Sequence, residues 1–426
     1  MTSNPPAQPG RALASPANLK QLNLICWSVF LVAFVLPFTV IVIASHRPPD
    51  GDFAGFYSLG RILNTHPMQD LYDYELQKQV CNEVHARAGA YGLLPYPPFV
   101  GMFFQPFARL PYPVAYVLWL LITFALYAAG LKLLIDRFLP LDPVRRSLLY
   151  CFAFAYSPFI IDTAASGQLA AVGFFALSVA LCQDDADHRF GSGLVLSLCL
   201  YKPTLLVLLL PMLLVTRRFR SLLGFAAGAA ALAALPTAIG GLGIWAVFFR
   251  TLHSFGKVAG GAQASTVLIL VKYVDLSSFS AFVHGGRSWA GLAILFLGSA
   301  ASAVFLLRYW WRSSRCGKPF NALLWAATIT WTLLLNVYVP MYDSILIVLA
   351  LVVTAGALQQ IPGPSMQRAF RALWILIVAG SWFSGALDGV TTVQLLTVLF
   401  GALGILEFAV LSRIAPLQPD SAHPVP

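Results

Sequence analysis

Charged residues are scarce in this 426-residue chain: aspartate, glutamate, lysine and arginine together make up 10% of it. A water-soluble globular domain carries about 25% of such residues, so that class of protein is excluded. Apolar residues make up 58% of the chain, and the mean hydropathy is +0.76. This composition is typical of a protein that places most of its length in a lipid bilayer.

Cysteine is also scarce. The 6 cysteines are scattered and no two are spaced as Cys-x-x-Cys, which excludes a disulfide or metal framework of the usual kinds. Only Cys81 lies well outside an apolar run or its flank, so we expect no disulfide. The histidines of the polar segments, His66, His85, His253 and His284, lack the spacing of metal ligands. We therefore expect no metal site and no cofactor.

A signal-peptide cleavage site is missing as well. The first 22 residues are polar and proline-rich, and an apolar run from Leu24 to about Ala44 follows them without a small-residue cleavage pattern. The sequence therefore predicts a disordered cytoplasmic tail over residues 1–22 and a retained first transmembrane helix.

Apolar runs separated by short polar segments predict an all-α polytopic membrane protein with about twelve transmembrane helices. After the first run, the others lie near 113–131, 147–163, 168–183, 191–202, 203–215, 222–241, 289–307, 320–338, 344–359, 372–387 and 393–412. The stretch 97–112 is apolar but interrupted by prolines, which predicts a re-entrant or interfacial segment. We expect one membrane domain over 23–412, with outer loops at 45–112 and 242–288, and a cytoplasmic tail over 413–426.

The net charge of +10 comes from short basic clusters between the apolar runs. Such clusters indicate contact with an anionic membrane leaflet, so we expect membrane lipids and no nucleic acid among the partners. With both termini in the cytoplasm, most lysines and arginines lie on the cytoplasmic side, as the positive-inside rule requires. The two long loops then face the exterior.

Five polar or proline-bearing interruptions lie at or near this outer face. They are Asp52, "YPPF" (96–99), "GQ" (167–168), "YKP" (201–203) and "PMYD" (340–343). Five interruptions scattered at random along the chain would rarely all lie on the same side of the membrane. The simplest interpretation is one extracytoplasmic site that is assembled from several helix ends.

Each candidate residue also has an ordinary structural interpretation. Asp50, Asp52, Asp70, Asp73 and Glu75 can be solvated loop charges, but Asp52 differs because it lies near a helix end and precedes the aromatic stretch "FAGFY". A partly desolvated carboxylate there can serve as a general base.

Three candidates interrupt apolar segments. Lys202 either extends its ammonium to the membrane interface or presents it to a phosphate. Gln168 either caps the helix that follows it or contributes to the site. Asp343, beside Tyr342, interrupts an apolar pair of helices, where an aspartate is a functional candidate.

The ordered segments "DFAGFYSLGRIL…LYD", "YPPF…LP…W", "GQ", "YKPTLLVLLLP" and "PMYDSIL" resemble glycosyltransferase family 87 over about residues 20–355. This bacterial and archaeal family has the GT-C fold and is typified by polyprenyl-phosphate-mannose-dependent alpha-mannosyltransferases. The resemblance implies an enzyme of the bacterial cytoplasmic membrane, with its active site facing the periplasm or exterior. It implies a polyprenyl-phosphate-linked sugar as donor and a lipid or glycan as acceptor.

The resemblance also implies roles for particular residues. Asp52 matches the family's essential acid and would be the catalytic base, and Lys202 would bind the donor phosphate. Tyr57, Tyr96, Gln168, Tyr342 and Asp343 are expected to bind substrate. Thr204 stands where many members have glutamine, and "YD" at 342–343 matches only one branch of the family.

Inverting transfer would need one base and a group that stabilises the departing phosphate, and Asp52 and Lys202 would supply both. The stretch "DGD" at 50–52 matches the Asp-x-Asp pattern of sugar-nucleotide enzymes only formally and is expected outside the cell, so we expect no nucleotide-sugar donor. Two alternatives stay open on the sequence alone. They are a transporter or flippase of lipid-linked sugars and a non-catalytic subunit of a glycan-assembly complex.

Overall fold

The structure, a computed structural model, describes residues 16–36, 39–40, 51–84, 94–262, 272–283, 289–313, 316–337, 339–361, 363–391 and 393–414. Within these ranges every regular element is a helix, and the one β-type contact is an isolated bridge between Tyr273 and Pro340. The expected all-α class is confirmed. Residues 1–15 and 415–426, which hold most of the two predicted tails, lie outside the described residues. The first helix begins at Pro16 rather than after residue 22.

The helices of the N-terminal half are α1 (Pro16–Phe30), η1 (Leu31–Val35), α3 (Phe53–Thr65), η2 (Met68–Tyr72), α4 (Tyr74–Val84), α5 (Pro98–Phe104), η4 (Phe107–Arg109), α6 (Tyr112–Phe138), α7 (Pro143–Phe154), η5 (Pro158–Ala165) and α8 (Ala170–Asp185). Those that follow are α9 (Arg189–Leu196), η6 (Ser197–Tyr201), η7 (Pro203–Leu206), α10 (Leu209–Val215), α11 (Phe219–Gly240), α12 (Gly243–Ala262), α14 (Leu276–Val283), α15 (Trp289–Arg312), α16 (Lys318–Leu335), η9 (Met341–Ile345), α17 (Leu346–Gln359), α18 (Pro364–Thr391) and α19 (Leu395–Ile414).

Among the described residues, 6 helices are long and apolar enough to cross a bilayer, or 7 if the bent pair α7–η5 counts as one span. The chain is therefore a multi-pass membrane protein, while the number of twelve spans stays a prediction. Several predicted spans are short. For example, the 16 residues of α8 extend for only about 24 Å, against a hydrocarbon core of about 30 Å.

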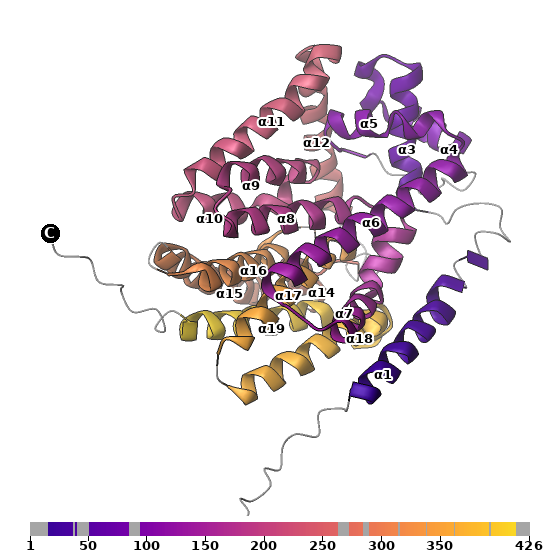
Figure 1. Ribbon diagram of the computed structural model, residues 1–426. Helices are drawn as coiled ribbons and strands as arrows, with labels where there is room; N and C mark the ends of the chain where they lie inside the picture. The colour runs from indigo at the N-terminus through magenta and orange to yellow at the C-terminus, as the bar shows by residue number, and fades with distance from the viewer. Residues whose placement is uncertain are drawn as a thin grey trace, which may run out of the picture.

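The predicted outer loop 45–112 is largely helical where the structure describes it. It folds into α3, η2, α4, α5 and η4, which Figure 1 shows gathered beside α12 at one end of the molecule. Apolar side chains of this unit, including Leu59, Ile62 and Leu71, pack with Ile244 and Phe248 of α12. The unit therefore has a small core of its own, which holds α3 in a fixed position.

The main core lies between α6, α8, α16, α17 and α19. α17 is buried over most of its length, because its apolar residues face neighbours on all sides. α1 instead lies along the flank of the molecule against α7 (Figure 1), where the Trp27 indole donates a hydrogen bond of 2.9 Å to the Ser147 hydroxyl.

Helix breaks concentrate in three places. η5 is a π-helical turn bent by 60° from α7 and begins at Pro158. η6 and η7 are 3₁₀ turns on either side of Lys202, with Pro203 opening the second, and η9 is a 3₁₀ turn after Pro340. Proline cannot donate the backbone hydrogen bond of a regular helix, and π and 3₁₀ turns within helical segments often mark functional positions. These breaks carry three of the polar interruptions in the sequence.

Candidate active site

Asp52 lies at the N-terminus of α3 but does not cap it. Aspartate at this position usually accepts a hydrogen bond from the first turn of its own helix, whereas the Asp52 side chain makes no such bond. Its Oδ2 instead accepts hydrogen bonds from the Gln168 amide and, at 3.3 Å, from the Ser166 hydroxyl. Phe53 and Phe56 beside it are fully buried. The carboxylate thus lies between a dry aromatic cluster and a polar turn from another part of the chain.

Two glycines allow this close approach. A Cβ on Gly51 would lie 2.6 Å from the Ser166 carbonyl oxygen, and a Cβ on Gly167 would lie 2.5 Å from Cβ of Phe53. Gly167 also has φ = 76°, a conformation that side chains disfavour. α6 fixes the turn from behind, since the Trp119 indole donates to the Gly167 carbonyl at 2.9 Å.

Gln168 connects Asp52 to Tyr96. Its Nε2 donates to Asp52, and its Oε1 accepts a hydrogen bond of 3.5 Å from the Tyr96 hydroxyl. The carbonyl of Tyr96 accepts a hydrogen bond of 2.7 Å from Tyr72, which anchors the "YPPF" segment to η2. The N-cap of α8 is Leu169, so the structure does not use Gln168 as a helix cap.

Lys202 and Asp343 form a buried ion pair. The Lys202 ammonium donates to Oδ2 of Asp343 and lies 4.6 Å from the centre of the Tyr342 ring, in a cation–π arrangement. The Lys202 side chain is 14% exposed and that of Asp343 1% exposed. Lys202 therefore does not extend to solvent away from the core, as the interfacial interpretation required. The other carboxylate oxygen of Asp343 is buried without a hydrogen-bond partner.

The two halves of the site share η5 and the turn after it. Ser166 and Gln168 hold Asp52, while the Thr163 hydroxyl donates to the Tyr342 carbonyl at 3.3 Å. Tyr201, next to Lys202, lies within electrostatic range of both Asp343 and Tyr96. The structure thus brings together Asp52, Tyr96, Gln168, Lys202, Tyr342 and Asp343.

Tyr57 is placed differently from the other candidates. Its hydroxyl donates to the Leu110 carbonyl at 2.8 Å, and its ring packs on Tyr112. This position supports the aromatic cluster next to Asp52 and does not bring the hydroxyl to the carboxylate.

Two other carboxylates of the predicted outer loop 45–112 lie at the surface. Asp73 and Glu75 are exposed, and Oδ1 of Asp73 accepts a hydrogen bond of 2.9 Å from the backbone of Leu76 in the first turn of α4. Asp73 thus orders the loop, as expected. Asp50 lies outside the described residues.

Asp275 supports the site but was not singled out in the sequence. It is fully buried and accepts hydrogen bonds from the backbone of Val339 (3.0 Å) and Ser278 (2.8 Å). Burial raises the pKa of the Asp275 carboxyl, and these hydrogen bonds act in the opposite direction. Because it ties the chain before α14 to the segment before η9, Asp275 positions Tyr342 and Asp343. The only signal in the sequence was an aspartate next to an apolar stretch.

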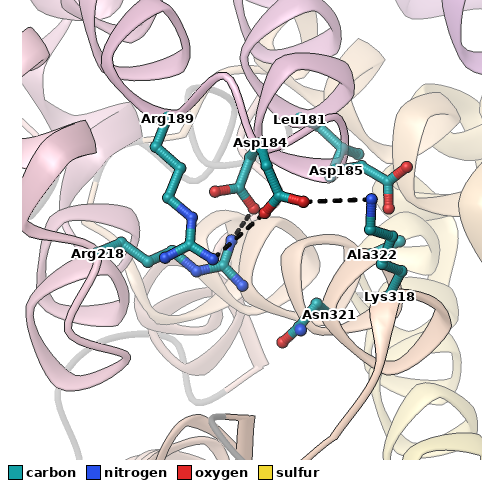
Figure 2. A pocket seen from close by; sticks show the side chains of 9 residues that line it. Leu181, Asp184, Asp185, Arg189, Arg218, Lys318, Asn321 and Ala322 are labelled. Carbon is teal, nitrogen blue, oxygen red and sulfur yellow. Dashed lines mark hydrogen bonds and ion pairs between the residues drawn. The ribbon is translucent and has the colours of Figure 1, made fainter.

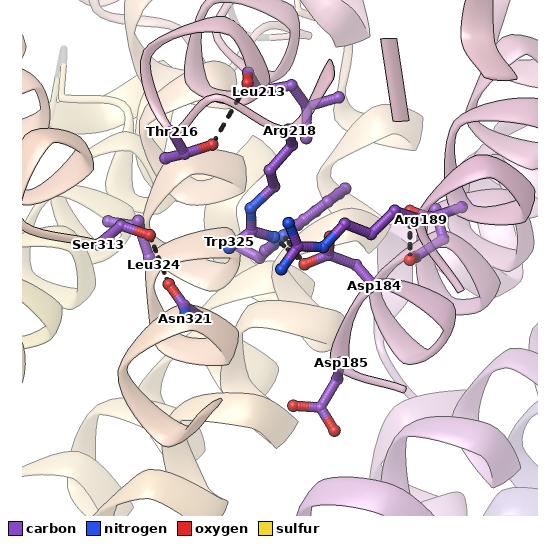
Figure 3. Close-up of polar contacts among 12 residues, drawn as sticks. Asp184, Asp185, Arg189, Leu213, Thr216, Arg218, Ser313, Asn321, Leu324 and Trp325 are labelled. Carbon is purple, nitrogen blue, oxygen red and sulfur yellow. Dashed lines mark hydrogen bonds and ion pairs between the residues drawn. The ribbon is translucent and has the colours of Figure 1, made fainter. Parts of the chain in front are cut away.

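A second buried ion pair lies at the other end of α8. Figure 2 shows Asp184 and Arg218 meeting beside a cavity of about 40 Å³, which Arg189, Lys318 and Asn321 also line. Oδ2 of Asp184 also accepts a hydrogen bond of 3.1 Å from the Trp325 indole (Figure 3). Burial lowers the pKa of Arg218 to about 10. This pair joins the ends of α8, α11 and α16.

The described residues hold no group of three or more histidine, cysteine, aspartate or glutamate side chains that could hold a metal ion. All 6 cysteines are free thiols. The Asp52 end offers two groups, a half-buried carboxylate held by Gln168 and the Lys202 ammonium held by Asp343. Such a pair can take a proton and stabilise an anion.

Comparison with known proteins gives a family but no individual relative. The family model of glycosyltransferase family 87 matches residues 94–336, which is more than half of the chain. The match includes Tyr96, Gln168 and Lys202, and it leaves Asp52 and Asp343 outside. No curated protein and no solved structure matches the chain. The chain belongs to glycosyltransferase family 87 and is a membrane glycosyltransferase.

Proposed function

We propose that this protein transfers a sugar, a hexose such as mannose or a related pentose, from a polyprenyl-phosphate donor to a glycolipid or glycan acceptor. The reaction inverts the anomeric centre and takes place on the outer face of the bacterial cytoplasmic membrane. The observation that carries this proposal is the Asp52 carboxylate, which does not cap its own helix and is held by Gln168 and Ser166 at the end of the molecule that contains Lys202.

Asp52 is the general base of this reaction. As the acceptor oxygen bonds to the anomeric carbon, its hydroxyl proton passes to Asp52. The bond between the anomeric carbon and the phosphate oxygen breaks, and its electron pair leaves with the polyprenyl phosphate. A phosphate leaving group needs no proton, so one carboxylate is enough, unlike in a glycosidase. Gln168 fixes the carboxylate by donating to one oxygen.

Lys202 stabilises the leaving phosphate. A lysine that is 14% exposed is largely dry, and a charge-assisted hydrogen bond to phosphate is strong in such surroundings. Asp343 and Tyr342 hold the ammonium in place in a largely apolar setting. Asp343 is therefore a positioning residue for the cation.

The charge distribution supports the proposed orientation. The end with Asp184 and Arg218 also carries Arg137, Arg189 and Lys318, as expected for the cytoplasmic side. The Asp52 end then faces the exterior, where lipid-linked sugars and not nucleotide sugars are supplied. A GT-C fold with about twelve spans is part of the same proposal.

A donor test distinguishes these possibilities. Purified protein in detergent is given membrane lipid extract as acceptor and either polyprenyl-phosphate-[³H]mannose, the corresponding glucose and arabinose donors, or GDP-[³H]mannose. We expect label to enter a new glycolipid only from a polyprenyl-phosphate donor. A flippase or a non-catalytic subunit forms no new glycosidic bond, so the absence of product from every lipid donor, or product from GDP-mannose, contradicts the proposal.

A further inference from the structure

Asp162 is a carboxylate within the apolar stretch "SPFIIDTAA", in the middle of the π-helical turn η5. An ionisable residue inside a membrane segment is costly and usually has a function. In the described part of the chain, neither oxygen of Asp162 makes a hydrogen bond to the protein. This differs from Asp275 and Asp184, whose carboxylates accept hydrogen bonds from neighbouring groups.

The position of η5 places Asp162 between the two halves of the active site. Ser166, four residues later, holds Asp52, and the adjacent Thr163 donates to the Tyr342 carbonyl. Asp162 is itself half-buried, so the residue is neither fully enclosed by protein nor freely solvated.

The charged neighbours of Asp162 belong to the same site. It lies within electrostatic range of Lys272 and of Asp52. Lys272 is fixed by its backbone, since its carbonyl accepts a hydrogen bond of 2.9 Å from the Met341 N–H, directly before Tyr342. Lys272 offsets part of the negative charge that Asp162 and Asp52 bring near each other.

A second base is not needed for the transfer, so the accessible carboxylate has another use. A carboxylate has two oxygens that accept several hydrogen bonds and none that donate, and sugars present neighbouring hydroxyl donors. We propose that Asp162 binds hydroxyl groups of a substrate sugar and thereby orients the sugar toward Asp52.

Because this role rests on the proposed function, the test separates the two. Binding of polyprenyl-phosphate-mannose and of polyprenyl phosphate without sugar is measured on detergent-purified wild type, Asp162→Asn and Asp162→Glu. If Asp162 binds the donor sugar, Asp162→Asn should bind polyprenyl-phosphate-mannose about 10- to 100-fold more weakly than wild type does. Its binding of polyprenyl phosphate without sugar should be unchanged. If it binds the acceptor sugar, donor binding is unchanged and the KM for the acceptor extract rises by a similar factor.

The remaining variants test structural explanations. Asp162→Glu keeps the charge and should recover part of the loss, whereas a defect in folding would lower the melting temperature of both variants. Asp187→Asn is the matched control, because Asp187 is exposed at the opposite end and its φ of 63° is one that asparagine tolerates. Wild-type donor binding and acceptor KM in Asp162→Asn would overturn the inference. The proposed function would still stand if sugar transfer from the lipid donor were observed.

Discussion

The two ends of α8 carry two buried ion pairs of different kinds. At its start, Gln168 leads to Asp52 and to the Lys202–Asp343 pair, and at its end Asp184 pairs with Arg218. The second pair is closed, because both side chains are at most 6% exposed and Trp325 donates to the carboxylate. The first pair is more open, because Lys202 is 14% exposed.

The backbone around the two pairs differs in the same way. Asp184 and Arg218 lie at the ends of regular α-helices, and arginine binds a carboxylate with a planar, rigid fork. Lys202 lies between two 3₁₀ turns, the second of which begins at Pro203, and Asp343 lies on a 3₁₀ turn that follows Pro340. Buried charge alone therefore does not identify a site. Buried charge on broken helices is the better indicator.

The largest expected effect is on stability at the closed end, which is the end of α8 with the Asp184–Arg218 pair. Arg218→Met leaves Asp184 buried without its cation, which should lower the free energy of unfolding by about 3–5 kcal/mol. The melting temperature of the detergent-purified variant measures this. Arg220→Met, which removes an exposed arginine of the same helix, is the control and should melt like wild type. An unchanged melting temperature for Arg218→Met would show that the pair does not stabilise this end.

The next largest effect is on donor binding at the open end, which is the end of α8 near the Lys202–Asp343 pair. Lys202→Met should weaken binding of the polyprenyl-phosphate donor by about 10- to 100-fold, because a charge-assisted contact in a dry site contributes about 1.5–3 kcal/mol. Lys202→Arg should retain part of the affinity. A titration of donor against each folded variant measures the loss. If Lys202→Met bound donor as wild type does, Lys202 would have only a structural role.

The smallest effect is expected at the exposed rim of the closed end. Hydrogen bonding to Lys318 lowers the pKa of Asp187 below 3.8, so the contribution of Asp187 is complete above pH 3.8 and disappears as the pH falls through its lowered pKa. Asp187→Asn should lower the melting temperature by no more than about 2 °C at pH 7, and the difference should vanish near pH 2. A difference that grew on acidification would contradict this assignment.

Much of the open end could be predicted from the sequence, because its charges stand in apolar surroundings. Asp52, Lys202 and Asp343 were recognisable in this way, and the order of their motifs indicated the family. The pairing of Lys202 with Asp343 was not predictable, since about 140 residues separate them and it is the packing of both η6 and η9 on α8 that brings the two turns together.

The closed end was harder to predict because its residues look like ordinary loop charges. "DDADHRF" and "TRRF" both lie between apolar runs, and nothing in either stretch indicates that Asp184 and Arg218 turn inward. Asp162 was missed for the opposite reason, since it falls inside a run that was interpreted as a continuous span. The bend of 60° between α7 and η5 interrupts that run a few residues before Asp162.

The most direct test of the account is the rate of sugar transfer by Asp52→Asn. Asparagine keeps an oxygen that can accept from Gln168 but cannot take the acceptor proton, so turnover should fall by at least about 100-fold. The melting temperature and donor affinity should stay near wild type. Asp73→Asn is the matched control, because asparagine can also cap α4, and it should transfer sugar almost normally. Near-normal transfer by Asp52→Asn from the polyprenyl-phosphate donor would contradict the assignment of Asp52 as the base.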